Sequence, residues 1–353
     1  MNLYTLKKYA FSAKNLVLDK KKEYEKKLKG GFIGCGIHAT ENIYPCLRYC
    51  PVELEAVCAP HEFKAKRNAQ WFGAKRIYTD YKEMFDKEKL DAVFVVVNRK
   101  LHKEICYSAL QKGIPVFVEK PPVNSLEEIK ELIQTSKETG KLCFVAFQKR
   151  YAPIYQRAKE IMCTASFGTP TVQVRYAGRS LGSEEDFLWE VGIHYIDLLR
   201  YFLGDVKSIF VEKQTGNGST FLMTFRFKNN TIGSLLFTGQ IGNQSSERVE
   251  IYGREQSIII DNLRELFYYK GKPTKEKFQQ KQGAEVWTLN GTQVHAENQS
   301  LFLNGYAYEV QDFIASIKEN KKPRNRIENC FQNIKILEAL CKENKKNFFK
   351  EFA

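Results

Sequence analysis

The chain has 353 residues, of which 43% are hydrophobic and 13% aromatic, and a formal net charge of +14. This length allows two domains of ordinary size, and the composition is that of a globular protein rather than a disordered one. No run approaches the ~20 apolar residues of a membrane span, and lysines interrupt the first 29 residues. We therefore expect neither a membrane segment nor a signal peptide.

The nine cysteines are scattered and include no Cys-x-x-Cys pair, which predicts reduced thiols in a cytoplasmic protein and no zinc cage. The positive charge raises the possibility of a nucleic-acid partner. Much of the excess, however, lies in lysine runs near the two ends, where acidic residues are interleaved with the lysines. Such runs are typical of solvated helix faces, so we expect no nucleic-acid partner. The runs are Lys20 to Lys22, Lys26-Lys27, Lys321-Lys322 and Lys345-Lys346.

Residues 1–29 are expected to form a lysine-rich N-terminal extension. From residue 30 to residue 150, short apolar segments alternate with helical ones, which predicts an α/β domain with a doubly wound parallel sheet. The predicted strands cover 31–33, 53–58, 76–78, 91–97, 114–118 and 141–147. The predicted helices cover 39–47, 65–71, 102–112 and 125–139, the last with Glu128 as its capping-box partner.

A glycine-rich turn follows the first strand of this domain. Gly34 permits a tight reversal, Gly36 lets the backbone approach a pyrophosphate, and Ala39 allows close packing of helix on strand. Free N–H groups at the helix start would face the anion. The motif alone could be no more than a compact turn, but with the motifs further along the chain it predicts a dinucleotide site. Its residues are Gly34, Cys35, Gly36, Ile37, His38 and Ala39.

After residue 150 the pattern changes, which predicts a second, α+β domain over residues 151–353. Helices are expected at 153–162, around His194 up to Gly204, at 306–319 and at 327–342. Strands are expected at 171–176, 206–212, 221–227, 231–238 and 248–260. Because the last four follow one another without helices, we expect a mostly antiparallel, open-faced sheet. Its strands carry apolar residues on both faces, which favours a homodimer or homotetramer.

Three motifs occur in one order: the glycine turn, Glu119-Lys120-Pro121, and Gly192-Ile193-His194-Tyr195-Ile196-Asp197. Together they resemble the glucose–fructose oxidoreductase / inositol dehydrogenase family over residues 30–345. The segment from Val97 to His102 matches a loop that in the family usually reads Thr-Pro-Asn-x-x-His. The resemblance implies an NAD(P)-dependent oxidoreductase that acts on a small-molecule sugar, polyol or nucleotide-linked sugar. It also implies that Asn98, His102, Glu119 and Lys120 contact the cofactor.

Lys120 is a candidate catalytic residue because it ends a parallel strand, where open α/β sheets bind ligands. Two prolines follow it and restrict its backbone. Its ammonium group could stabilise a developing alkoxide, although a solvated lysine is the alternative.

His194 and Glu190 are spaced i, i+4 and would share one helix face, with Asp197 one turn further on. A histidine suits proton exchange with a carbinol, and a nearby carboxylate can orient it. We predict catalytic roles for His194 and Glu190, although a core histidine is the alternative. The family usually has Asp or Asn where Glu190 stands, which leaves the role of Glu190 open. No third ligand completes a metal site, so no metal is expected.

Arg150 and Tyr151 follow the last strand of the first domain, and the resemblance makes them candidate substrate contacts, together with Asp197. Surface charge for Arg150 and a structural role for Asp197 are the alternatives. The end of the second strand carries Ala59 where the family often has an acid that binds the ribose 2′-hydroxyl. We therefore expect NAD or NADP, with NADP slightly favoured. The alternative is that Glu62 or a backbone group binds the 2′-hydroxyl and that NAD is used. A non-catalytic NAD(P)-binding regulator of the same fold remains the alternative function.

Overall fold

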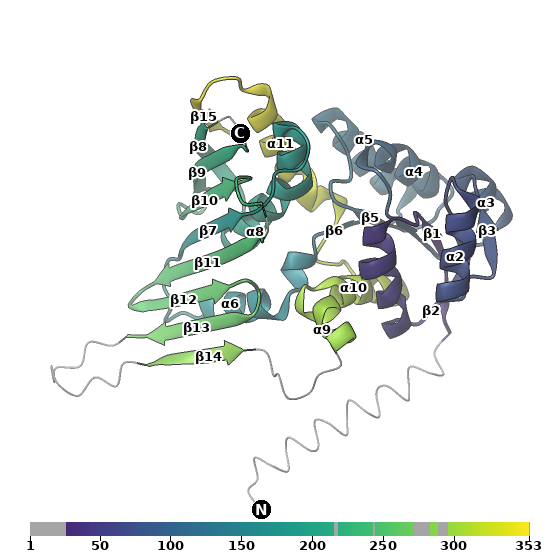
Figure 1. Ribbon diagram of the computed structural model, residues 1–353, viewed down its shortest axis with the longest axis horizontal. Helices are drawn as coiled ribbons and strands as arrows, with labels where there is room; N and C mark the ends of the chain where they lie inside the picture. The colour runs from purple at the N-terminus through teal and green to yellow at the C-terminus, as the bar shows by residue number, and fades with distance from the viewer. Residues whose placement is uncertain (1–25, 215–217, 243, 272–282, 289–295, 353) are drawn as a thin grey trace, which may run out of the picture.

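The computed structural model of the protein describes residues 26–214, 218–242, 244–271, 283–288 and 296–352, without the side chains of 296–299. These residues form two sheets that stand side by side with helices between and around them (Figure 1). Of the predicted N-terminal extension, residues 1–25 lie outside the described residues. The first strand begins at Leu28, three residues before the predicted start.

The first sheet has six strands in the order β3-β2-β1-β4-β5-β6, and all neighbouring strands are parallel. This confirms the predicted doubly wound α/β architecture. The strand order reverses between β1 and β4, the position at which such sheets bind ligands. The strands are β1 Leu28–Ile33, β2 Val52–Cys58, β3 Arg76–Tyr78, β4 Ala92–Val95, β5 Val116–Glu119 and β6 Cys143–Ala146. The helices are α2 Glu62–Phe72, α3 Tyr81–Lys87, α4 Arg99–Gln111 and α5 Leu126–Thr139.

Helix α5 shows how local sequence sets these bounds. The Ser125 hydroxyl accepts a hydrogen bond from the Glu128 N–H at 3.2 Å, and Gly140, with φ of 64°, ends the helix. The Glu128 carboxylate accepts from the Asn124 N–H at 2.7 Å rather than from the Ser125 N–H. The predicted capping box is therefore wrong in its second half, because the carboxylate reaches one residue further back.

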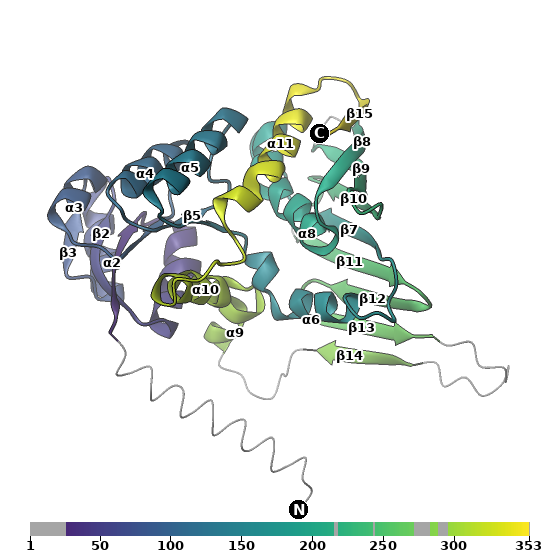
Figure 2. The same ribbon diagram turned by 180° about the vertical axis from the view of Figure 1, so that it is seen from behind.

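The second sheet has nine strands in the order β14-β13-β12-β11-β7-β10-β9-β8-β15 and is antiparallel except for the β7–β10 pair. This confirms the predicted mostly antiparallel sheet. Figure 2 shows α6 and α8 on one of its faces. The strands are β7 Thr171–Ala177, β8 Val206–Gln214, β9 Thr220–Phe227, β10 Ile232–Thr238, β11 Ser246–Gly253, β12 Gln256–Asp261, β13 Glu265–Lys270, β14 Ala284–Thr288 and β15 Asn347–Glu351. The helices are α6 Pro153–Met162, α7 Glu184–Phe187, α8 Ile193–Leu203, α9 Ala296–Leu303, α10 Tyr306–Lys318 and α11 Ile327–Lys342.

One predicted strand is wrong. Residues 248–260 form not a single strand but the hairpin of β11 and β12, and the chain reverses at Arg254 and Glu255. Glu255 has a φ of 56°, a left-handed conformation that is uncommon outside glycine, so the residue type at this position does not mark the turn. The strands β13, β14 and β15 extend the sheet beyond the predicted set.

Helix α10 returns from the second half of the chain to the first sheet. Phe313 on this helix lies with its ring centroid 5.5 Å from Phe94 and 5.7 Å from both Phe117 and Phe144, which come from β4, β5 and β6. All four side chains are fully buried. This aromatic cluster joins the C-terminal part of the chain to the sheet that carries the glycine turn.

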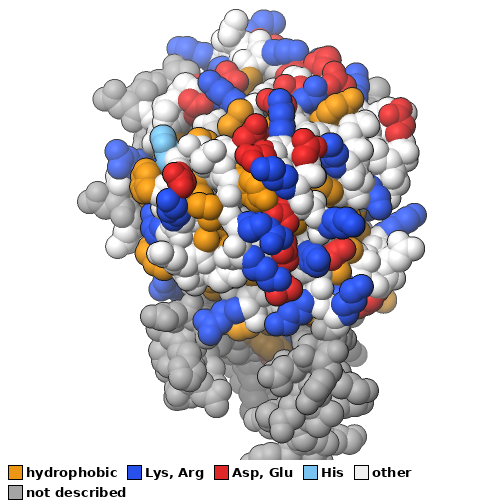
Figure 3. Space-filling model, turned by 90° about the vertical axis from the view of Figure 1, so that its right-hand side faces the viewer, with side chains coloured by type: hydrophobic (Ala, Val, Ile, Leu, Met, Phe, Trp, Pro, Cys, Tyr) orange, Lys and Arg blue, Asp and Glu red, His pale blue; other side chains and the backbone are white. Residues whose placement is uncertain are grey.

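The surface of the N-terminal half carries both signs of charge. Over the face drawn in Figure 3, Lys and Arg side chains are interspersed with Asp and Glu rather than gathered into one basic patch. None of the described helices is both long and apolar enough to cross a bilayer. All nine cysteines are among the described residues, and none of them forms a disulfide.

Candidate active site

A cavity of about 610 Å³ lies at the carboxyl ends of the first sheet's strands, around the point where the strand order reverses. Most of the predicted cofactor residues line it, and Glu190 reaches it from the second half of the chain. The lining residues are Gly34, Cys35, Gly36, Ile37, His38, Ala39, Ala59, Pro60, His61, Lys64, Val96, Val97, Asn98, Leu101, Glu119, Lys120 and Glu190.

The two glycines of the turn differ in what surrounds them. Gly34 has a φ of 113°, and a Cβ at this position would lie 1.9 Å from the carbonyl oxygen of Val96. A Cβ on Gly36 would meet no atom of the described residues within 4 Å. Gly34 is thus required by the fold, whereas the space over Gly36 is open to the cavity, as a close approach of pyrophosphate requires.

The segment after the glycine turn is helical but not a regular α-helix. A π-helical turn covers Ala39–Ile43, and a 3₁₀ turn covers Tyr44–Tyr49. Pro45 has no N–H to donate to the preceding turn, so the continuous helix implied by the sequence is interrupted there. Ala39 is buried against the sheet as predicted, and Ile37 is 77% exposed at the edge of the cavity.

His38 and Glu119 join the glycine turn to the end of β5. The His38 Nε2 lies 2.9 Å from the Glu119 Oε1, and the His38 Nδ1 lies 3.1 Å from the amide nitrogen of Asn42. Burial lowers the pKa of His38, but the charge and hydrogen bond of Glu119 outweigh it and raise that pKa above its usual value. Burial likewise opposes the ionisation of Glu119, but His38 and Lys120 hold its pKa below its usual value.

His102 lies behind the cavity and does not line it. Its Nδ1 donates a hydrogen bond to the Pro121 carbonyl oxygen at 2.7 Å, and its side chain is buried. It therefore supports the Lys120-Pro121 segment, whose peptide bond is cis. Asn98 does line the cavity, and its side-chain oxygen caps α4 by accepting from the Lys100 N–H at 3.1 Å. A direct contact of His102 with a cofactor stays a prediction.

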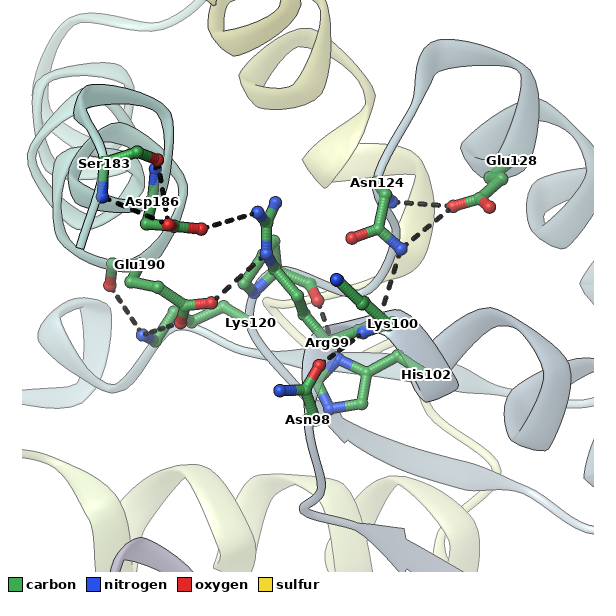
Figure 4. Close-up of polar contacts among 11 residues, drawn as sticks. Asn98, Arg99, Lys100, His102, Lys120, Asn124, Glu128, Ser183, Asp186 and Glu190 are labelled. Carbon is green, nitrogen blue, oxygen red and sulfur yellow. Dashed lines mark hydrogen bonds and ion pairs between the residues drawn. The ribbon is translucent and has the colours of Figure 1, made fainter. Parts of the chain in front are cut away.

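Lys120 and Glu190 both line the cavity and contact each other (Figure 4). Its Nζ donates to the Glu190 carbonyl oxygen at 2.8 Å and lies 3.9 Å from the Glu190 Oε2. Glu190 belongs to a π-helical turn, Leu188–Gly192, that precedes α8. Glu190 and His194 therefore do not share one regular α-helix, as the i, i+4 spacing suggested, because the wider turn intervenes.

His194 lies in α8, in the electrostatic field of Lys120, Lys149 and His38. Burial, followed by the charges of Lys120, Lys149 and His38, holds the pKa of His194 well below its usual value. Its Nδ1 is buried and has no hydrogen-bond partner among the described residues. The imidazole is therefore neutral near pH 7, which is the form that can accept a proton.

Lys149 and Glu247 form a buried charge network beside His194 that the sequence motifs did not reveal. The Glu247 carboxylate accepts hydrogen bonds from Lys149 and from the hydroxyls of Tyr155 and Tyr195. The Lys149 Nζ also lies 4.9 Å from the centroid of the Tyr195 ring. Although burial opposes its ionisation, Lys149 and the two hydroxyls hold the pKa of Glu247 below its usual value. No sequence motif links residues 149 and 247, so the network can be identified only from the structure.

Arg150, Tyr151 and Asp197 lie together away from the cavity lining. Arg150 donates two hydrogen bonds to Asp197, at 2.6 and 2.7 Å, and Asn333 donates a third at 2.7 Å. Tyr151 donates to Asp312 at 2.7 Å. Arg150 and Asp197 thus form an ion pair in the protein interior. This contact agrees with the alternative interpretation of Asp197 as a structural residue. Their contact with a substrate stays a prediction.

Basic side chains stand at the end of β2, where the ribose of a dinucleotide would lie in this fold. His61 and Lys64 line the cavity next to Ala59. Arg67, one turn further along α2, donates to the Cys35 carbonyl oxygen of the glycine turn at 3.1 Å. Among the described residues that line the cavity, the acids are Glu119 and Glu190, and neither belongs to this end of β2.

The parallel sheet reverses its strand order between β1 and β4, the backbone at Gly36 is accessible from the cavity, and Lys120 follows β5. Together these features define a dinucleotide-dependent oxidoreductase. Residues 28–147 match the model of an oxidoreductase family with an NAD-binding Rossmann fold, and residues 178–347 match the model of that family's C-terminal alpha/beta domain. The chain therefore belongs to this family, Gfo/Idh/MocA, whose members are NAD-dependent oxidoreductases.

Known relatives agree with this assignment. The scyllo-inositol 2-dehydrogenase (NAD(+)) of Bacillus subtilis is 26% identical over 291 residues, which cover 77% of this chain and 80% of that protein. A solved dehydrogenase from Chromobacterium violaceum has a TM-score of 0.82 and 21% identity, over 90% of this chain and 95% of that one. A levoglucosan dehydrogenase in complex with NADH and L-sorbose has a TM-score of 0.78 and 18% identity, over 93% and 100%. At such identities the structural likeness establishes the fold alone.

Proposed function

We propose that the protein is a dehydrogenase that moves hydride between a nicotinamide dinucleotide and a secondary carbinol of a sugar, polyol or nucleotide-linked sugar. The observation that carries this proposal is the meeting of Lys120 and Glu190 at the dinucleotide cavity, with a neutral His194 nearby. Residues 30–150 would bind the dinucleotide, and residues 151–353 would bind the substrate and mediate association.

Each of the three side chains has a separate role in this proposal. A bound nicotinamide would supply the hydride acceptor or donor. The Lys120 ammonium donates a hydrogen bond to the reacting oxygen and stabilises the charge that develops on it. His194, neutral near pH 7, accepts the hydroxyl proton during oxidation and returns it during reduction. Glu190 orients the Lys120 ammonium through its carboxylate and its carbonyl oxygen.

The proposed substrate class is tested by turnover. Inositols, aldoses, glycosides and nucleotide-linked sugars would each be mixed with the full chain and either oxidised cofactor, and the reduced nicotinamide would be followed by absorbance. We expect at least one carbinol of these classes to be oxidised. Tight nucleotide binding without turnover of any of them would instead favour the alternative function, a regulator or sensor of the same fold.

NADP should bind at least as tightly as NAD. Ala59 leaves no carboxylate to repel a 2′-phosphate at the end of β2, and His61 and Lys64 line the same part of the cavity. Lys64→Ala should weaken NADP binding by about 10-fold, or 1.4 kcal/mol, with little effect on NAD. Titration of both cofactors measures this, with Lys66→Ala as a matched control, because Lys66 is paired with Glu62. Wild-type binding of NAD at least ~10-fold tighter than NADP would refute the preference.

The protein should associate through the face of the nine-stranded sheet opposite α6 and α8. Phe210, Leu222 and Phe349 are exposed on this face, and Phe349 pairs with Phe210 in the register of β15 on β8. An apolar sheet face of this kind is typical of an interface. Sedimentation at micromolar concentration should show a dimer or tetramer, and Leu222→Asp should dissociate it. Phe63→Asp, on an exposed aromatic of α2, is the control. A wild-type monomer would contradict this expectation.

A further inference from the structure

Arg99 reaches from the first sheet to the segment that carries Glu190. It is the first residue of α4, directly after the helix cap at Asn98. Only 12% of its side chain is exposed, and its guanidinium carbon lies 5.4 Å from the centroid of the Trp189 ring. The motifs of the sequence give Arg99 no role. Its contacts therefore need an explanation of their own.

The guanidinium contacts two carboxylates of the second half of the chain (Figure 4). The Arg99 Nη2 donates to the Asp186 Oδ1 at 3.0 Å, and the Arg99 Nε forms an ion pair with the Glu190 Oε1 at 3.4 Å. Asp186 is itself held by Ser183, whose hydroxyl donates to it at 2.8 Å and whose N–H does so at 3.2 Å. The planar guanidinium is thus fixed in orientation at one carboxylate while it contacts the other.

The carboxylate of Glu190 is divided between two cations. Its Oε1 faces Arg99, and its Oε2 faces the Nζ of Lys120 at 3.9 Å. Glu190 is 37% exposed, so without the second cation its flexible side chain could turn toward solvent. The contact with Arg99 therefore keeps the Glu190 Oε2 beside Lys120. Lys120 is the residue that we propose to donate a hydrogen bond to the reacting oxygen of the substrate.

We propose that Arg99 is a positioning residue that holds the carboxylate of Glu190 beside Lys120 and ties the two halves of the site together. Its effect on turnover rests on the proposed function, whereas the tie between Arg99 and Glu190 is a property of the free protein. The two parts can therefore be tested separately.

The tie is tested without substrate by a double-mutant cycle in the full chain. The free energy of unfolding is measured by denaturant titration for the wild type, Arg99→Met, Glu190→Gln and the double variant. Each substitution is expected to lower the folding equilibrium constant by some factor. In the double variant this factor should be at least ~3-fold smaller than the product of the factors of the two single variants. Because Asp186 is present in all four proteins, its own contact with Arg99 cancels. Purely multiplicative losses would overturn the tie.

The positioning role is tested on a substrate from the turnover screen. Arg99→Met should lower kcat by about 10-fold to 100-fold with little change in KM, because misplacement of a reacting group affects the transition state more than binding. Arg99→Lys should recover part of kcat, and the double variant should be no slower than Glu190→Gln. Lys100→Met, at the neighbouring exposed lysine, should retain wild-type turnover. An unchanged kcat in Arg99→Met, or losses that multiply in the double variant, would overturn the role. If the wild type turns over no carbinol, the proposed function is wrong. The contact between Arg99 and Glu190 is then tested by the double-mutant cycle alone.

Discussion

Replacing His194 with alanine is expected to lower kcat by ~10² to 10⁴-fold, the usual loss when one proton-transfer group is removed. The reason is the state of the imidazole. Burial and the charges of Lys120, Lys149 and His38 keep its pKa well below the ordinary value, so it is neutral and able to accept the hydroxyl proton. Because this proton moves in the transition state, the dissociation constant of the cofactor should change little.

Lys120→Met should give a loss of kcat of the same order, because it removes the hydrogen-bond donor to the developing alkoxide. The Lys100→Met variant controls for the removal of a lysine charge, since Lys100 is exposed and does not line the cavity. Steady-state kinetics and cofactor titration, done on the same preparations, separate turnover from binding. Near-normal turnover in His194→Ala on the true substrate would show that another group carries the proton.

Three strands of the first sheet could be predicted closely because they are short, fully buried and mainly apolar runs. Each of β4, β5 and β6 is buried at every position, so an apolar run bounded by polar residues marks it. The hairpin of β11 and β12 could not be predicted in the same way. Gly253 and the polar residues Arg254 to Ser257 interrupt its apolar pattern, but the turn itself is made by Glu255, a residue type that carries no turn preference.

The residues of the site that could be predicted are those that belong to short sequence motifs. The glycine turn and Lys120 are each read from neighbouring residues, and both line the cavity. Lys149 and Arg150 are neighbours in a 3₁₀ turn, and the sequence could not say which of them lies beside His194. The structure pairs Arg150 with Asp197 and Lys149 with Glu247, and the second pairing joins residues 98 positions apart. Arg99 and Asp186 likewise meet only through the fold.

Gly36→Val is expected to abolish dinucleotide binding and to leave the fold intact. Within the part of the chain that the structure describes, a Cβ on Gly36 meets no atom within 4 Å, so the side chain extends into the cavity rather than into the core. That space is the one a pyrophosphate needs when it approaches the backbone of the turn. Affinity for the cofactor should fall by more than ~100-fold, about 2.8 kcal/mol, while the circular dichroism spectrum and the unfolding midpoint stay those of the wild type.

Two further glycine variants test whether the loss of affinity arises because the new side chain occupies the space of the ligand. Gly242→Val also adds a side chain where no atom of the described residues lies within 4 Å, but between β10 and β11, and this variant should bind cofactor normally. Gly34→Ala should instead destabilise the whole protein, because its Cβ would meet the Val96 carbonyl oxygen at 1.9 Å and φ is 113°. Cofactor affinity that is unchanged in a folded Gly36→Val variant would place the dinucleotide elsewhere, and the assignment of this turn would then be wrong.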